Sequence, residues 1–357
     1  MKTISYPLLI ISFLLCQIAY SQTSSIDKVK FFEDTSMINA SITTDMVKIF
    51  REKDKIGVQF PANFSATFQD GSKMDDSILL VIRGHFRRAN CYLPPLKVIF
   101  NNKKKEKGEV KKEEKKVKVK NTSLGSLKLV SQCKTSETDE QYLLKEYLIY
   151  KIYNLITDMS FRARLINLNL VDNSGKKKTI KEYSFLMEDI KDLARRNQCK
   201  SWKEGKMDPR DVDRRQMTIV SIFEYMVGNT DWGVSVNHNT KLIISKKDSL
   251  QRPYVVPYDF DFSGFVNTDY SVPDDRLNIT SVRQRLYRGF PRSIEEINEV
   301  LDIYKKQKSS IYSLINNFDL LTSKSKKDII GYLDDFYSTI NNPREVKNVF
   351  IDNARTN

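Results

Sequence analysis

The sequence predicts an α+β protein with two lobes, a β-rich N-terminal lobe and a mostly helical C-terminal lobe. Up to about position 100, short alternating or fully apolar runs are separated by turn-forming residues such as Pro61 and Gly71, which is typical of strands. Beyond about position 293, apolar residues recur at helical spacing with charged residues between them. We therefore assign residues 22–190 to the first lobe and residues 191–357 to the second.

The first 21 residues predict a cleavable secretory signal peptide. Lys2 supplies a positive start, residues 8–18 are almost entirely apolar, and Ala19 and Ser21 place small residues where a signal peptidase reads them. The apolar run is shorter than the ~20 residues that cross a bilayer, and no later segment is apolar for long enough. We expect cleavage before Gln22, no transmembrane segment afterwards, and a location in the periplasm, at the cell surface or outside the cell.

A large part of the formal net charge of +14 falls in one segment. Residues 103–120 contain ten lysines and four glutamates, so they carry +6 of the total. Proteins that bind single strands use aromatic stacking surfaces, and no aromatic residue interrupts this run. We interpret it first as a solvated loop, which argues against nucleic acid as a partner, and second as a patch for acidic polymers or a membrane surface.

Cysteine and histidine content limits the chemistry. After signal cleavage the chain keeps Cys91, Cys133 and Cys199, so one disulfide can form and at least one thiol stays unpaired, but the sequence does not choose the pair. His85 and His238 are the only histidines. A histidine-rich zinc site does not fit this composition, and a Ser-His-Asp hydrolase would have to use one of these two residues.

The first lobe is expected to contain strands, one long helix and a hairpin. The helix at residues 138–157 has Leu144, Leu148 and Ile152 on one face and Thr138 as its N-cap. A turn at residues 173–175 predicts the hairpin. The expected strands are residues 56–60, 64–68, 78–84, 93–100, 124–130, 163–171 and 183–189.

The mostly helical part of the second lobe is expected to begin near residue 208. A helix at 211–228 ends at Gly228, because glycine easily adopts the left-handed conformation of a C-terminal cap. Strands at 241–245 and 254–260 are separated by a polar segment and predict a second hairpin. Helices follow from about residue 293, and no internal repeat is evident.

Polar residues flank this second hairpin. The loop before it contains Asp231 and Asn239, and the loop after it contains Asp259 and Asp261. Because a hairpin reverses the chain, the two loops can lie side by side. Carboxylate and amide oxygens are the ligands that Mg²⁺ prefers, and a further carboxylate can orient or deprotonate an attacking hydroxyl, as in phosphoryl transfer.

The competing interpretation is structural. Asp and Asn in loops most often cap helices or close turns. The pair Asp259 and Asp261 is harder to explain in this way, because the two acids lie one residue apart beside an apolar strand, where unpaired charge is costly to bury.

Five motifs follow one another along the chain. They are an RG pair near a PPLK strand, a lysine on a later strand, a helix, GNTDW followed by HN, and VPYDFDFSG. Their order resembles the CotH-type atypical kinases, and more closely the exported relatives common in Bacteroidota. The resemblance covers roughly residues 80–265, and the last two motifs are its most specific parts. It implies a two-lobed protein-kinase-like fold, ATP and Mg²⁺ as cofactors, and phosphoryl transfer.

The resemblance also implies roles for the acidic loops. Asp231 matches the catalytic-loop aspartate, which accepts the proton of the substrate hydroxyl. Asn239 matches the metal-binding asparagine of that loop, and Asp259 matches the aspartate that holds Mg²⁺ against the phosphates. Asp261 would be a second metal ligand.

Cationic residues in the first lobe complete the implied site. Lys128 best matches the strand lysine that neutralises nucleotide phosphates, with Lys134 as the alternative. Glu146, in the middle of the following helix, is the candidate for the glutamate that positions the lysine. The arginines of RGHFRR either face phosphate or only solvate a strand edge; they are Arg83, Arg87 and Arg88.

Two departures from the family pattern affect the implied activity. The step from Asp231 to Asn239 is longer than in many kinase loops, and no GxGxxG segment is present to cover phosphates; residues 124–126 are too little to replace one. His238, beside Asn239, is expected to make structural hydrogen bonds.

The leading hypothesis is an exported CotH-like kinase that transfers phosphate from a nucleotide to a protein or surface polymer. The alternative is a catalytically inactive secreted binding protein with a kinase-like fold, because the glycine loop is missing and exported compartments are poor in ATP. A third hypothesis is binding of polyanions through residues 103–120.

Overall fold

The structure is a computed structural model, and it describes residues 28–33, 35–84, 86–100, 124–248 and 250–355. The predicted signal peptide and the lysine-rich segment 103–120 lie outside these described residues. Within them, no helix has both the length and the apolar character needed to cross a membrane.

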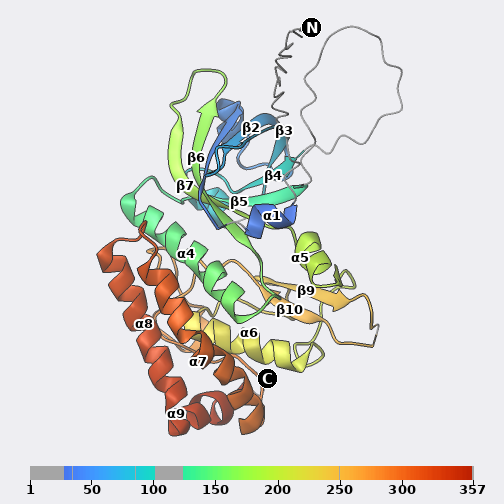
Figure 1. The fold of residues 1–357 in the computed structure, drawn as a ribbon, viewed down its shortest axis with the longest axis vertical. Helices are drawn as coiled ribbons and strands as arrows, with labels where there is room; N and C mark the ends of the chain where they lie inside the picture. Colours follow the sequence, from blue (N-terminus) through green and yellow to red (C-terminus); the bar gives the residue numbers. More distant parts are fainter. Residues whose placement is uncertain (1–27, 34, 85, 101–123, 249, 356–357) are drawn as a thin grey trace, which may run out of the picture.

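Seven strands of the N-terminal half close into a barrel, which occupies the upper part of Figure 1. The order round the barrel is β1, β2, β3, β4, β5, β7, β6, and a parallel pairing of β6 with β1 closes it. All other neighbours are antiparallel. The strands are β1 (Ile38–Thr44), β2 (Gln59–Thr67), β3 (Lys73–Ile82), β4 (Leu96–Phe100), β5 (Ser126–Val130), β6 (Ala163–Asp172) and β7 (Ile180–Met187).

Alternating side chains fill the barrel. In β2, Phe60 and Phe64 are buried while their neighbours along the strand are exposed or half-buried, as the period of two in a strand requires. The strands expected at 56–60 and 64–68 are therefore one strand, and Pro61 does not break it. Pro61 lies just beyond the last residue of β2 that pairs with β1, and its carbonyl accepts a hydrogen bond from the Thr44 hydroxyl at 3.0 Å.

The prediction of a two-lobed protein-kinase-like α+β fold is wrong. The N-terminal strands form a closed mixed barrel, and a small separate sheet lies among the helices of the other half. The closing contact joins Ile38 to Ile166, residues far apart in the sequence. Local apolar patterns identify individual strands, but they do not specify such a distant parallel pairing.

Long helices and a three-stranded sheet form the rest of the molecule, below the barrel in Figure 1. The sheet has the order β10, β9, β8, and it shares one apolar core with the four long helices. These elements are α4 (Glu137–Ile156), α5 (Ile190–Arg196), β8 (Cys199–Ser201), α6 (Arg214–Val227), β9 (Thr240–Ser245), β10 (Tyr254–Pro257), α7 (Ile294–Asn316) and α8 (Ser323–Asn341).

Short elements complete the chain. They are α1 (Lys28–Glu33), α2 (Met46–Arg51), α3 (Phe86–Asn90), a 3₁₀ turn (Asp275–Leu277), α9 (Pro343–Lys347) and a π-helical turn (Asn348–Asp352). A disulfide between Cys91 and Cys133 joins the end of α3 to the segment before α4, and Cys199 is a buried free thiol. This bridge places the arginines near α3 close to the start of α4.

Helix ends follow local chemistry. The N-cap of α4 is Ser136, whose hydroxyl accepts a hydrogen bond from the Asp139 amide at 3.0 Å, so the predicted cap at Thr138 is wrong by two residues. The predicted end of α6 is confirmed, because Gly228 is its left-handed C-cap with φ of +66°. An added Cβ at Gly228 would collide with the Tyr332 hydroxyl, so only glycine fits there.

Candidate functional site

The second predicted hairpin is confirmed, and it brings the two acidic loops to the same end of the small sheet. β9 and β10 are antiparallel, with Thr240 opposite Pro257. Immediately beyond this pair, the Tyr258 amide donates a hydrogen bond to the Asn239 carbonyl at 2.9 Å. The loop that ends at Asn239 is thus directly bonded to the loop that begins at Tyr258.

In the first loop, Asp231 is held from several sides. His238 Nε2 lies 2.7 Å from its Oδ1, and Asn239 Nδ2 donates to its Oδ2 at 3.0 Å and to its backbone carbonyl at 2.8 Å. The Asp231 amide in turn donates to Asn229 Oδ1 at 3.0 Å. The Asp231 side chain is still 39% exposed, so its carboxylate is fixed in place and accessible to a ligand.

In the second loop, Asp259 and Asp261 are fixed by tyrosines. The Asp259 amide donates to the Tyr150 hydroxyl of α4 at 2.9 Å, and the Tyr270 hydroxyl donates to Asp261 Oδ2 at 3.0 Å. Burial first, and then the charge of Asp259, raise the pKa of Asp261 to about 6, with a smaller contribution from Asp231. Both Asp259 and Asp231 therefore act electrostatically on Asp261.

Both loops contain strained backbone. Asn237, Asn239 and Asp259 have φ angles of +53°, +49° and +69°, a left-handed region that side-chain-bearing residues adopt infrequently. Such residues persist where the surrounding structure holds them, and they gather at functional sites. The strain here coincides with the hydrogen-bonded junction between the loops.

The barrel presents cations to these loops. Lys128 of β5 interacts with Asp259, and its Nζ lies 3.9 Å from the centroid of the Tyr258 ring. Burial, together with the nearby charge of Arg83, lowers the pKa of Lys128 to about 7. Arg83 is half-buried and interacts with Asp259, and its Nε donates to the Leu96 carbonyl at 3.4 Å.

Behind the acidic loops, the half-buried Arg87 and the buried Glu146 interact electrostatically. Burial alone would lower the pKa of Arg87, but Tyr270, Asp261 and Glu146 outweigh it and raise that pKa. Burial, and then the charge of Asp261, raise the pKa of Glu146 well above its usual value, while Arg87 and Arg83 oppose the rise. Glu146 Oε1 has no hydrogen-bond partner in the described part of the chain.

The structure thus brings together most of the residues that the sequence singled out. They are Asp231, Asn239, Asp259, Asp261, Lys128, Arg83, Arg87 and Glu146. The cations that act on Glu146 are Arg87 and Arg83, whereas the sequence interpretation made Glu146 the residue that positions Lys128. Lys134 pairs instead with Asp269 at 2.6 Å, and Arg88 donates to the Asp54 and Gly84 carbonyls.

Several residues of the site were missed by the sequence interpretation. Tyr150 follows Glu146 by four positions on α4, so helical spacing could have indicated that both face the same loops. Tyr270 and Arg288 have no comparable local signal. Arg288 donates a hydrogen bond to the Trp232 carbonyl at 2.7 Å and so supports the first loop. Its position depends on tertiary packing.

The residues present fit part of a magnesium site. Among the described residues, no group of three or more His, Cys, Asp or Glu side chains is arranged to hold a metal ion alone. Mg²⁺ in nucleotide sites, however, takes one or two carboxylates and completes its shell with phosphate oxygens and water. Asp259 and Asp261, two interacting carboxylates beside Asn239, fit that smaller donor set, and Lys128 and Arg83 fit the phosphates.

The fold and the site together describe a protein in which a barrel and a helical part place cations opposite two acidic loops. No protein-family model, curated protein or solved structure matches the chain. The resemblance to CotH-type kinases therefore rests on the sequence motifs, and any functional proposal depends on the geometry of the site.

Proposed function

We propose that the protein is an exported phosphotransferase that moves a phosphoryl group from a nucleotide such as ATP to a hydroxyl of a protein or surface polymer, with Mg²⁺. The observation that carries the proposal is the junction of the two acidic loops at the end of the β9–β10 hairpin, opposite Lys128 and Arg83. Phosphoryl transfer depends mainly on positioning and on neutralising phosphate charge, and this arrangement supplies carboxylates and cations for both tasks.

Each loop has its own task in this proposal. Asp259 and Asp261 would hold Mg²⁺, which neutralises the negative charge of the phosphates when it is bound. Lys128 and Arg83 would contact phosphate oxygens from the barrel side. Asp231, oriented by His238 and Asn239, would accept the proton of the attacking hydroxyl.

A cavity next to Asp231 offers room for the acceptor. It has a volume of about 530 Å³ and is lined by Asp231, His238, Trp232, Phe262 and Arg288, among others. An acceptor hydroxyl that enters this cavity would approach the carboxylate from its exposed side. This placement separates the acceptor from the cations of the barrel.

Export is proposed on two grounds. The first 21 residues have the pattern of a signal peptide. The Cys91–Cys133 disulfide is a second ground, because such bridges persist mainly in oxidising compartments.

The test is phosphate transfer by purified protein supplied with labelled ATP and Mg²⁺. We expect Asp259→Asn and Asp231→Asn each to lower transfer by roughly a hundredfold or more. Asp269→Asn is the matched control, because Asp269 lies in the same region of the chain but pairs with Lys134 on the surface, and it should keep full activity.

Two results would contradict the proposal. One is the absence of nucleotide binding at millimolar concentration with Mg²⁺, and the other is transfer that survives in Asp259→Asn. Nucleotide binding without any transfer would favour the alternative, a non-catalytic secreted binding protein.

A further inference from the structure

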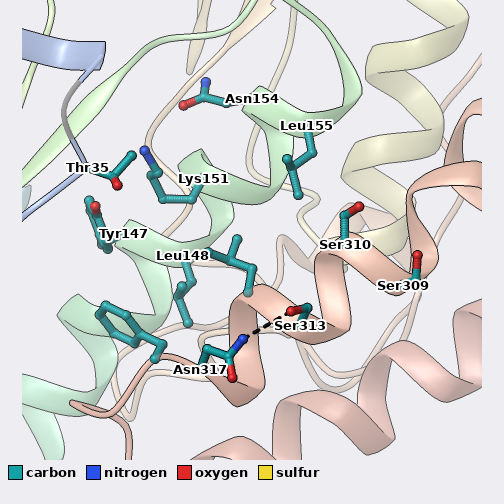
Figure 2. Close-up of a pocket in the computed structure, with 12 residues that line it drawn as sticks. Thr35, Tyr147, Leu148, Lys151, Asn154, Leu155, Ser309, Ser310, Ser313 and Asn317 are labelled. Atoms are coloured by element: carbon teal, nitrogen blue, oxygen red, sulfur yellow. Dashed lines mark hydrogen bonds between the residues drawn. The ribbon is translucent and has the colours of Figure 1, made fainter. Parts of the chain in front are cut away.

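A second cavity lies between α4 and α7 and involves neither acidic loop (Figure 2). Its volume is about 820 Å³, within the range of ~300–1,000 Å³ that is usual for small-molecule sites. The α4 residues that line it, at positions 147, 148, 151, 154 and 155, occupy a different face of the helix from Glu146 and Tyr150. The cavity is therefore separate from the proposed phosphoryl-transfer site.

Polar side chains lie on two sides of this cavity, and apolar side chains form part of its wall. Leu148, Leu155, Leu314 and Phe318 provide apolar wall. Figure 2 shows Lys151 and Thr35 on one side of the space and the serines of α7 on the other. A ligand with an apolar body and one charged end could place the body against the leucines and the charged end against Lys151.

Lys151 has no counter-charge among the residues that the structure describes. In the described part of the chain its ammonium has neither an ion pair nor a hydrogen bond, although the side chain is partly buried. Burial, and then the like charges of Arg162 and Arg164, lower the pKa of Lys151, and no carboxylate opposes them. A partly buried cation without a partner is costly, so an anion in the cavity would relieve this cost.

We propose that this cavity binds a small amphiphilic carboxylate, with the apolar body against the leucines and the carboxylate against Lys151. A single ammonium matches a single negative charge better than the double charge of a phosphate monoester. The neighbouring arginines already have other partners: Arg162 lies 3.9 Å from Glu33, and Arg164 donates to the Phe31 carbonyl at 2.8 Å. Of these three cations in the described chain, Lys151 is thus the one left for a ligand.

Titration calorimetry with two probes tests the proposal. 4-Phenylbutyrate and 4-phenylbutyramide share one apolar body and differ in the charge of the polar end. The carboxylate should bind about tenfold more tightly than the amide, as expected for a charge-assisted contact. Lys151→Gln should remove this preference and leave amide binding unchanged, and Lys151→Arg should keep it.

Two further variants locate the binding. Lys181→Gln, at an exposed position of β7, is the matched control and should keep the preference. Ser310→Trp, which places a large side chain in the cavity, should abolish binding of both probes. Equal affinities for the two probes, a preference that survives in Lys151→Gln, unchanged binding in Ser310→Trp, or no binding of either probe at its solubility limit would each overturn the proposal. Because no nucleotide is involved, the result does not depend on the proposed phosphotransferase activity.

Discussion

At Asp261, burial opposes the negative charge of the carboxylate. Its carboxyl group is buried beside Asp259 and has a pKa of about 6, compared with 3.8 for an unperturbed aspartate. Between these two pH values the folded protein keeps a proton that the unfolded chain has lost. The folded state is therefore favoured at the acidic end of this window, and its stability falls as the pH rises towards 6.

Asp261→Asn should stabilise the protein at neutral pH. The amide has no charge to bury and can still accept the hydrogen bond from Tyr270. We expect the free energy of unfolding to rise by roughly 1–3 kcal/mol at pH 7 and not to change below about pH 4, where the aspartate is already protonated. Urea denaturation at the two pH values measures this, and a loss of stability at pH 7 would contradict it.

Lys128 should be an unusually reactive amine. With a pKa of about 7, roughly three quarters of its side chains are neutral at pH 7.5, compared with roughly 0.1% for an ordinary lysine. Limited reaction with an amine-acylating reagent, followed by mass spectrometry, should find Lys128 modified before the exposed Lys181. Nucleotide with Mg²⁺ should slow the modification if the proposed site is correct, and labelling of both lysines at the same rate would contradict the shifted pKa.

The identities of many site residues could be predicted from the sequence, but not all of their partners. The motifs around Asp231 and Asp259 lie close to one hairpin, so their proximity follows from local patterns. Glu146, in contrast, interacts electrostatically with Arg87, a residue far away in the sequence, and no local pattern encodes this interaction.

Among the elements, α4 connects the two halves of the molecule. One face carries Glu146 and Tyr150 towards the acidic loops, while another face lines the cavity that it shares with α7. Most residues of α4 are buried, and the helix contacts both α7 and the barrel strand β7. Substitutions on one face should therefore affect the acidic loops, and substitutions on the other face should affect the cavity between α4 and α7.

Tyr150→Phe should loosen the second acidic loop. The substitution removes the acceptor for the Asp259 amide, and an unsatisfied buried donor costs about 1–3 kcal/mol. We expect a loss of stability together with weaker binding of Mg²⁺ and nucleotide.

Tyr147→Phe, on the face of α4 towards α7, is the matched control and should leave that binding unchanged. Both variants can be followed by thermal denaturation and by nucleotide titration. Equal effects of the two substitutions on nucleotide binding would show that Tyr150 has no specific role.

Hairpins were the most predictable elements. The β9–β10 and β6–β7 hairpins each combine two apolar strands with a short polar connection, and such local signals fix both pairing and direction. The β1 strand was not singled out in the sequence. Its two partners, β2 and β6, lie far apart along the chain, and its pairing with both closes the barrel.

At the scale of the whole molecule, the error in fold class has one physical source. The sequence showed many strands before helices, and this order is compatible with an open sheet or a closed barrel. Closure depends on the parallel β1–β6 contact, which satisfies the edge groups of both strands. Such a contact is a property of the assembled chain and not of any short segment.

The disulfide should contribute strongly to stability. Its cysteines are 42 positions apart, and closing a loop of that length in the unfolded chain is worth about 4 kcal/mol. Reduction, or replacement of both Cys91 and Cys133 by alanine, should lower the free energy of unfolding by about this amount. Cys199→Ala is the control with a smaller expected loss, because Cys199 is a buried thiol outside the bridge; equal losses would contradict the prediction.

The same bridge joins the chain up to Cys91 to the chain from Cys133 onwards by a second covalent route. Hydrolysis of any one peptide bond between positions 91 and 133 would leave two polypeptides still linked through sulfur. The sequence of residues 103–120 contains ten lysines, the residue type after which trypsin cleaves. Such a nicked protein would migrate in an electrophoresis gel as one species without reductant and as two with it. A single cut in the backbone between Cys91 and Cys133 would therefore not separate the two fragments while the disulfide is intact.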